Sequence, residues 1–230
     1  MGGWLDRPNV RVRGVVFDLD GTLVDSYAAI AASLNAARES FGLEPLPEAD
    51  VRRRVGRGLE ALMADVLGPQ NAAAGVLIFR ERYATVFANG TTPLPGARET
   101  VRELHARGYR MSVASNKPAR FGRPILEHLG MARFLDAIEG PDTAGTTKPD
   151  PAMIGLCLRA MDVPSEAAIY VGDMVLDVET ASRAGVRVVL VPGGSSNRAE
   201  LAGTGATVLG SLREIVDLLP ATGNGAGTAR

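Results

Sequence analysis

The sequence predicts an α/β protein in which helices cover both faces of a parallel sheet, with an all-helical insert after the first strand. Short apolar, β-branched runs alternate with helical patterns along most of the chain, which is typical of a parallel sheet. The alternation stops between about residues 26 and 93, where only helical periodicity occurs. Polar and acidic clusters follow the predicted strands, and these mark where the sheet would open toward a ligand.

The predicted strands are short apolar runs of the kind that is buried on both faces of a sheet. The first spans Val12 to Leu19 and ends in acidic residues followed by Gly21. Further runs of the same kind lie at 111–114, 168–171, 186–191 and 206–209, with a weaker one at 135–139. Because helical patterns lie between these runs, we expect a parallel sheet built from them.

Helical spacing appears both between the strands and in the insert. Val101 and Leu104 mark a helix that ends at Gly108. Another helix is predicted to have Asp150 as its N-cap and Pro151 as its first residue. Its apolar stripe has i, i+3, i+4, i+7 spacing: Ile154, Cys157, Leu158 and Met161. The insert is predicted to hold three helices, at about 30–41, 59–67 and 71–88.

Composition excludes several classes of protein. The chain has 230 residues, 46% of them hydrophobic and 22% charged, and a formal net charge of −1. That near-neutral charge argues against a nucleic-acid binder with a general basic surface. One cysteine, Cys157, cannot form an intramolecular disulfide, and two histidines leave little room for a histidine metal centre.

We expect a cytoplasmic protein that does not act on a membrane. Residues 1–9 are polar and lack the apolar region of a secretory signal. No run of about 18 apolar residues occurs, so no membrane-spanning helix is predicted. The last residues, 220–230, are rich in glycine and small residues and are predicted to be disordered.

Four polar clusters are candidates for a functional site. The first, Asp18-Leu19-Asp20-Gly21-Thr22, follows the first strand, and paired carboxylates of this kind can hold Mg²⁺. The others are Ser115-Asn116-Lys117, Lys148-Pro149-Asp150-Pro151 and Gly172 to Asp177. Each alone is explained by turns, helix caps or surface charge. Together, at strand ends, they favour a ligand-binding crevice.

The basic residues are unevenly divided. Of 25, 23 are arginine and two are lysine, Lys117 and Lys148. A lysine that persists in such a chain can mark a place that needs a compact ammonium group. Composition alone leaves a chance occurrence equally open.

Four segments of the sequence resemble the motifs of the haloacid dehalogenase-like superfamily, in the same order. They are DLDGTLVDS (18–26), VASNKP (113–118), KPDP (148–151) and GDMVLD (172–177). The similarity extends over about residues 12–219 and is greatest to the phosphoglycolate phosphatase group. It implies a Rossmann-like core formed by residues 1–25 and 92–219, and a helical cap formed by residues 26–91.

The resemblance also implies catalytic roles. Asp18 would be the nucleophile that forms an aspartyl-phosphate, and Asp20 the general acid and then the general base. Ser115 and the amide of Asn116 would donate hydrogen bonds to the phosphoryl group. Lys148 would neutralise both Asp18 and the phosphate. A position between two anions suits a small point charge such as an ammonium group.

A metal site and a substrate site follow from the same resemblance. Mg²⁺ would be held by Asp18, the backbone carbonyl of Asp20 and Asp173, with Asp177 as an auxiliary ligand. Lys117 would lie beside the phosphate, although a structural role is equally open. Arg57, between two glycines, can pair with a substrate carboxylate or second phosphate, but a solvated arginine explains it as well.

The expected function is a Mg²⁺-dependent phosphatase that hydrolyses a small phosphorylated metabolite, with 2-phosphoglycolate as the first candidate. The second aspartate, Asp20, favours phosphate esters over carbon–halogen bonds, because an alkoxide leaving group needs an acid. A phosphosugar mutase similar to β-phosphoglucomutase, a pyrophosphatase or nucleotidase, and a non-catalytic binding protein stay open. Both a monomer and a homodimer are compatible with the sequence.

Overall fold

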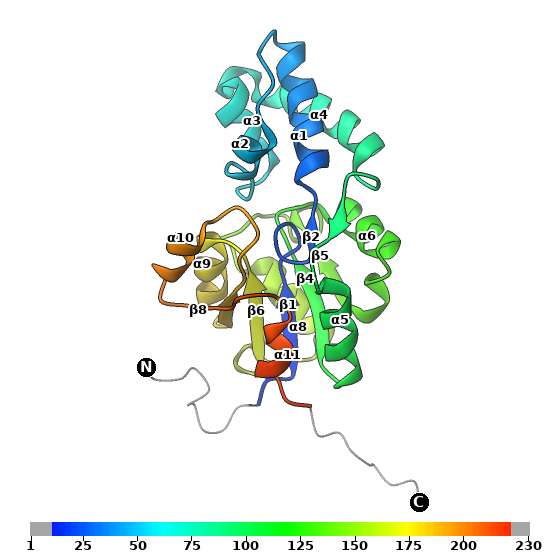
Figure 1. Ribbon diagram of the computed structural model, residues 1–230, viewed down its shortest axis with the longest axis vertical. Helices are drawn as coiled ribbons and strands as arrows, with labels where there is room; N and C mark the ends of the chain where they lie inside the picture. The colour runs from blue at the N-terminus through cyan, green and yellow to red at the C-terminus, as the bar shows by residue number, and fades with distance from the viewer. Residues whose placement is uncertain (1–10, 222–230) are drawn as a thin grey trace, which may run out of the picture.

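The protein is described by a computed structural model over residues 11–221 (Figure 1). The tail predicted to be disordered lies, from residue 222 onward, outside this range. Within it, six parallel strands form one sheet with the order β5-β4-β1-β6-β7-β8. Their bounds are β1 Gly14–Phe17, β4 Arg110–Ala114, β5 Ala137–Glu139, β6 Ala168–Gly172, β7 Arg187–Leu190 and β8 Thr207–Val208. Every predicted strand is therefore present: β1, β5, β7 and β8 are shorter than predicted, and β4 and β6 are each one residue longer.

The strand order places a crevice at the centre of the sheet. β1 lies between β4 and β6, and Phe17 is in register with Val113 on one side and Val171 on the other. Chain connections run outward from β1 through β4 to β5, and then return to β6 on the opposite side. In open α/β sheets, ligands bind where the order reverses, outside the carboxyl ends of the strands.

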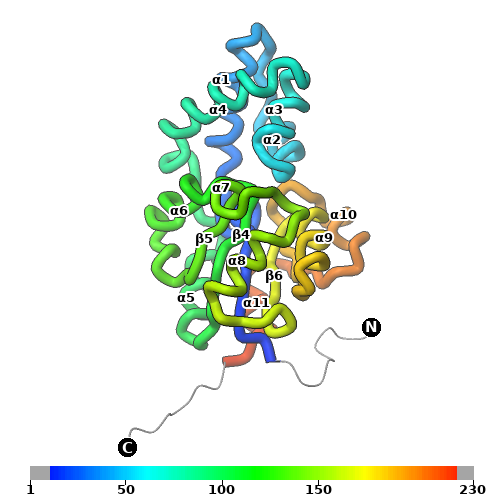
Figure 2. Tube along the Cα trace, turned by 180° about the vertical axis from the view of Figure 1, so that it is seen from behind, coloured from blue at the N-terminus to red at the C-terminus, as the bar shows by residue number. Residues whose placement is uncertain are grey.

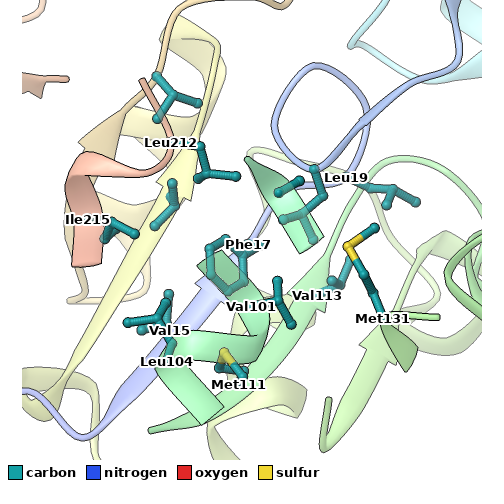
Figure 3. Close-up of a cluster of buried hydrophobic side chains, with 14 of the residues drawn as sticks. Val15, Phe17, Leu19, Val101, Leu104, Met111, Val113, Met131, Leu212 and Ile215 are labelled. Atoms are coloured by element: carbon teal, nitrogen blue, oxygen red, sulfur yellow. The ribbon is translucent and has the colours of Figure 1, made fainter. Parts of the chain in front are cut away.

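One face of the sheet packs on α5 (Ala97–Ala106), α6 (Ala119–His128) and α11 (Glu214–Leu218). Alternate residues of β1, Val15 and Phe17, point into this layer together with Met111 and Val113 of β4 (Figure 3). The period of two along a strand explains why Val16, between them, lies in a different cluster on the opposite face. Both faces of the strands are thus buried, as their apolar composition predicted.

The opposite face is covered by α8 (Ala152–Met161) and α9 (Val175–Arg183), and α8 lies in front of the sheet in Figure 2. The predicted start of α8 was wrong by one residue: the helix begins at Ala152, not at Pro151. Asp150 nevertheless accepts a hydrogen bond from the Ala152 N–H at 2.9 Å, so its carboxylate does satisfy a free donor at the helix start.

A helical unit, residues 27–86, lies beyond the carboxyl ends of the strands (Figures 1 and 2). It consists of α1 (Tyr27–Ser40), α2 (Glu48–Arg52), α3 (Leu59–Leu67) and α4 (Ala72–Val86). These helices share a hydrophobic cluster of their own, centred on residues such as Leu34, Met63 and Phe79. The short helix α2 was not predicted, because five residues are too few to show helical periodicity.

A short antiparallel pair of strands joins the helical unit to the sheet. β2 (Val24–Asp25) pairs with β3 (Thr92–Pro93), so the segments that enter and leave the unit lie side by side. The prediction that residues 26–93 contain no strand was wrong at β3. Two-residue strands have no readable pattern in the sequence.

The remaining helices are α7 (Pro141–Ala144) and α10 (Arg198–Ala202), with short 3₁₀ turns at 69–71, 132–134 and 165–167. None of the helices described is both long enough and apolar enough to cross a membrane.

Candidate active site

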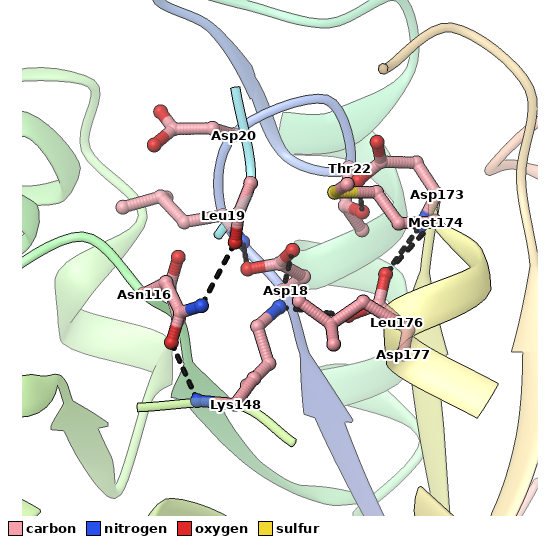
Figure 4. Close-up of polar contacts among 12 residues, drawn as sticks. Asp18, Leu19, Asp20, Thr22, Asn116, Lys148, Asp173, Met174, Leu176 and Asp177 are labelled. Atoms are coloured by element: carbon pink, nitrogen blue, oxygen red, sulfur yellow. Dashed lines mark hydrogen bonds and ion pairs between the residues drawn. The ribbon is translucent and has the colours of Figure 1, made fainter. Parts of the chain in front are cut away.

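The polar clusters converge at the carboxyl edge of the sheet. Asp18 directly follows β1, Ser115 follows β4 and Asp173 follows β6 (Figure 4). Because these three strands are neighbours in register, their first loop residues are brought together. Lys148 lies in the loop that precedes α8, and this loop reaches the same point.

Lys148 joins two of the carboxylates. Its Nζ lies 2.7 Å from Asp18 Oδ2 and 2.7 Å from Asp177 Oδ1, and its side chain is only 2% exposed. Burial alone would lower the pKa of Lys148, but the carboxylates of Asp177 and Asp18 outweigh burial and raise this pKa well above its usual value. Lys148 is therefore an ammonium ion at any physiological pH.

Asp177 both pairs with Lys148 and shapes the turn after β6. Its Oδ2 accepts hydrogen bonds from the backbone N–H groups of Asp173 (3.0 Å) and Met174 (2.9 Å). Gly172 makes this possible, because a Cβ there would lie 2.2 Å from Asp177 Oδ2. Asp177 thus orients both the lysine and the loop that carries Asp173.

Asp18, Asp173 and Asp177 form a buried group in which one carboxylate oxygen from each residue lies within 4.8 Å of the other two. Asp173 accepts hydrogen bonds from Thr22 Oγ1 and the Ser195 N–H, but among the described residues no cation forms an ion pair with it. Burial, then the charges of Asp177 and Asp18, raise the pKa of Asp173 well above its usual value. An oxygen-liganded divalent cation fits this group, because it would remove the cost of that unpaired carboxylate.

Two glycines let loops pack directly on Asp173. A Cβ at Gly194 would lie 1.6 Å from Asp173 Oδ2, and a Cβ at Gly21 would lie 2.6 Å from the same atom. Gly21 also has a φ of 84°, a conformation that favours glycine. The position of this carboxylate therefore depends on two residues that have no side-chain ligand atom.

Mg²⁺ is expected to raise the melting temperature, and to raise it more as the pH increases. Because the pKa of Asp173 is raised in the folded protein, the metal-free fold loses stability as the pH rises from the usual carboxyl pKa through this raised pKa. Mg²⁺ binds the ionised form and restores that stability. Thermal unfolding at pH 5.5 and pH 8, with and without Mg²⁺, measures the difference.

Gly194→Ala is the sensitive variant in this experiment, since its methyl group displaces Asp173. Displacing the surroundings of a metal ligand typically weakens affinity about 10- to 100-fold. Gly155→Ala is the matched control, because a Cβ there meets only Arg159 Nη1 at 3.6 Å. A shift that is independent of pH, or equal in both variants, would contradict the assignment.

Asp20 faces away from the carboxylate group, toward the helical unit (Figure 4). Ser26 Oγ donates a hydrogen bond to Asp20 Oδ1, and Lys117 Nζ lies 3.1 Å from Asp20 Oδ2. Lys117 also donates to the hydroxyl of Tyr83 at 2.7 Å. The carboxylate of Asp20 is thus engaged elsewhere, which leaves its backbone carbonyl as the atom available to a metal.

Ser115 and Asn116 lie where the sequence placed them, and Asn116 has a contact that the sequence did not reveal. Its Oδ1 accepts a hydrogen bond from the backbone N–H of Lys148 (2.7 Å), while its Nδ2 donates to the carbonyl of Gly56 (2.8 Å). Ser115 is buried, and its Oγ accepts the N–H of Lys117 at 3.3 Å. Asn116 therefore links the lysine loop to the helical unit.

A cavity between the helical unit and the sheet is lined by several of the predicted site residues. Asp18, Asp20, Ser115, Lys117 and Lys148 line it from the sheet side. The wall from the helical unit is largely apolar and includes Ile30, Val55, Leu59, Leu62, Phe79 and the ring of Tyr83. Gly56 and Gly58 line the cavity as well, but Arg57, which is exposed, does not.

Sequence reasoning missed Tyr83, Gly194 and Ser195, and it included Thr22 in the first cluster without giving it a role. The run Gly193-Gly194-Ser195 follows a predicted strand, so the strand-end rule that found the other clusters could also have found this one. Tyr83 gave no such signal, because its spacing from Phe79 is that of an ordinary apolar helix face.

The fold and the site together define a class of α/β proteins. Its members have aspartates and a buried lysine at the carboxyl ends of a parallel sheet, with a helical unit beyond them. The family model for haloacid dehalogenase-like hydrolases matches residues 15–191, and the chain belongs to this family. It is 35% identical to a phosphoglycolate phosphatase of Pseudomonas fluorescens over 213 residues (89% of this chain, 78% of the relative). It is 38% identical to one of Rhodospirillum rubrum over 205 residues (84% and 85%).

Solved structures show the same fold. A haloacid dehalogenase-like hydrolase of Streptococcus pneumoniae superimposes with a TM-score of 0.83 at 22% identity, covering 90% of this chain and 98% of the other. CbbY of Rhodobacter sphaeroides in complex with phosphate superimposes with a TM-score of 0.75 at 26% identity, covering 89% and 96%.

Proposed function

We propose that this protein is a Mg²⁺-dependent phosphatase that hydrolyses a small phosphorylated metabolite through an aspartyl-phosphate, with 2-phosphoglycolate as the first candidate. The observation that supports this most strongly is the buried Lys148–Asp18 pair, 2.7 Å apart, beside the unpaired carboxylate of Asp173. Such a group can neutralise a transferring phosphoryl dianion. The names of the relatives give the substrate candidate.

Asp18 attacks phosphorus, and the new Asp18–phosphorus bond forms as the bond to the ester oxygen breaks. Lys148 neutralises Asp18 and the phosphoryl oxygens together, because its ammonium is fixed by Asp177 on the far side. Ser115 and the amide of Asn116 donate hydrogen bonds to the same oxygens. A bound Mg²⁺ would supply additional positive charge for these oxygens.

Asp20 completes the reaction in two steps. As an acid it gives a proton to the departing ester oxygen, and as a carboxylate it then removes a proton from the attacking water. Water attack releases phosphate and restores Asp18, so the net reaction is ester plus water to alcohol plus phosphate. The helical unit would close over the site during the chemistry and limit access of bulk water.

The wall of the cavity favours hydrolysis of a compact acid over a phosphosugar mutase. A sugar places several hydroxyl groups against Ile30, Leu62 and Phe79, and each hydroxyl that loses water without gaining a partner has a cost. Arg80 lines the same cavity and can pair with a carboxylate. These features fit 2-phosphoglycolate better than a sugar phosphate.

We expect Mg²⁺-dependent release of phosphate from 2-phosphoglycolate with a higher kcat/KM than from glucose 6-phosphate, pyrophosphate or a nucleoside monophosphate. Treatment with EDTA should remove the activity and added Mg²⁺ should restore it. Phosphate release and sugar products are measured in parallel, because a mutase yields an isomerised sugar phosphate instead. Absence of metal-dependent release from every substrate, p-nitrophenyl phosphate included, would overturn the proposal.

A further inference from the structure

We propose that Tyr83 is a positioning residue for the reaction: through Lys117, it fixes the carboxyl group of Asp20 and so couples the placement of the helical unit to protonation of the leaving group. This inference rests on the phosphatase function proposed above. It assigns a role to a residue of α4 whose ring lines the cavity and whose hydroxyl contacts Lys117.

The contacts form a continuous chain from the helical unit to the acid. The Tyr83 hydroxyl accepts a hydrogen bond from Lys117 Nζ at 2.7 Å, and that same Nζ lies 3.1 Å from Asp20 Oδ2. Ser26 Oγ holds the other oxygen, Oδ1. Both oxygens of Asp20 are therefore held, one by the residue that precedes α1 and one by a lysine whose second partner is on α4.

The Tyr83 ring is fixed by aromatic neighbours. It stacks on Phe79 with the ring centres 5.4 Å apart and makes an edge contact with Phe121 at 5.2 Å. Phe87, the residue that follows α4, also stacks on it with the ring centres 6.0 Å apart. Tyr83 is 2% exposed, and burial raises the pKa of its hydroxyl, which stays protonated and accepts from the ammonium through its oxygen. The packed ring thus holds the hydroxyl oxygen 2.7 Å from Lys117 Nζ, with the buried side chain of Thr91 as its other neighbour.

Lys117 transmits the position of Tyr83 because it is itself buried. Its side chain is 6% exposed, and Tyr83 and Asp20 are the partners that its ammonium has among the described residues. An ammonium that loses one of these partners must move toward another or toward water, since a buried charge without partners is costly. Either movement changes the position of Asp20. A misplacement of about 1 Å at a reacting group can cost 100-fold in rate.

The chemistry makes this role measurable. When the ester bond breaks, an alkyl leaving group takes the proton of Asp20 and departs as an alcohol. A p-nitrophenolate leaving group is stable as an anion and departs without that proton. The value of kcat/KM covers the steps up to this departure, so a poorly placed Asp20 lowers kcat/KM for alkyl phosphates while it leaves the value for p-nitrophenyl phosphate nearly unchanged.

The test is Tyr83→Phe, which removes the hydroxyl and keeps the packed ring. We expect kcat/KM to fall about 10-fold or more for 2-phosphoglycolate and for a simple alkyl phosphate such as ethyl phosphate, and about 2-fold or less for p-nitrophenyl phosphate. In a Lys117→Met background, Tyr83→Phe should produce no further change in the ratio between the alkyl and nitrophenyl substrates.

Tyr109→Phe is the matched control, since it removes a hydroxyl that donates to the carbonyl of Pro220 at 2.6 Å in another part of the fold. It should leave the substrate ratio unchanged. If Tyr83→Phe lowered kcat/KM equally for all substrates, or did not lower it, the inference would be overturned, because Tyr83 would then have only a packing role. Failure of the proposed function is distinguishable, because the unmodified protein would then hydrolyse none of the esters.

Discussion

Asp18→Asn is expected to lower kcat by roughly 10⁴-fold or more, because the amide is a far weaker nucleophile than the carboxylate. The fold should be retained, since Lys148 keeps Asp177 as a partner at 2.7 Å. In the absence of Mg²⁺ we expect an equal or higher melting temperature, because one of the charges that raise the pKa of Asp173 is removed. Steady-state kinetics and thermal unfolding of the same preparation measure both effects.

Asp150→Asn provides the matched control for that substitution. Asp150 follows Lys148 in the same motif, but its carboxylate accepts the Ala152 N–H and does not line the cavity of the active site. The control should keep turnover within about 2-fold of the unmodified protein, as expected for a residue away from the reacting atoms. If Asp18→Asn kept comparable turnover, Asp18 would not be the nucleophile.

Lys148→Met is expected to destabilise the folded protein by about 3–5 kcal/mol at neutral pH, because it leaves the buried carboxylates of Asp18 and Asp177 without their cation. The loss should shrink as the pH falls, since the unpaired carboxylates then bind protons more tightly in the folded state than in the unfolded one. The folded pKa of Lys148 lies above its usual value, so the unmodified protein keeps this contribution until alkaline pH. Denaturant unfolding at pH 5 and pH 7.5 measures the difference.

Two further variants define the cause of the effect. Arg110→Met removes an exposed ion pair with Asp136 and should cost less than about 1 kcal/mol. Lys148→Arg retains the charge. In the unmodified protein one nitrogen, Lys148 Nζ, lies 2.7 Å from a carboxylate oxygen of Asp18 and 2.7 Å from one of Asp177, and a planar guanidinium does not fit this place. We expect it to lose most turnover, and near-normal turnover would show that charge alone is sufficient there.

The positions of the two lysines explain why they stand out in a chain whose other basic residues are arginine. Both lysines are buried at the crevice, and each lies within 3.1 Å of an aspartate from the first motif: Lys148 with Asp18, and Lys117 with Asp20. The sequence could indicate that a compact ammonium is used at these points. It could not indicate that Lys117 pairs with Asp20, because that contact depends on how two loops from different strands meet.

The sheet was predictable because its strands are buried on both faces and therefore appear as apolar runs, each closed by polar residues. The same rule found Asp18, Ser115 and Asp173. The contacts between the helical unit and the sheet were not predictable, because they depend on the relative placement of two separate hydrophobic clusters. Asn116 with Gly56, and Lys117 with Tyr83, are contacts of this kind.

The pairing of β2 with β3 has a consequence for how the protein can be altered. Asp25 is directly opposite Thr92, so the 66 residues between them begin and end at neighbouring points. A segment with adjacent ends can be exchanged for one of another size without changing the spacing of the strands it interrupts. Transplanting the helical unit between related hydrolases would therefore exchange the apolar wall of the cavity and leave Asp18, Asp20 and Lys148 in place on the sheet side.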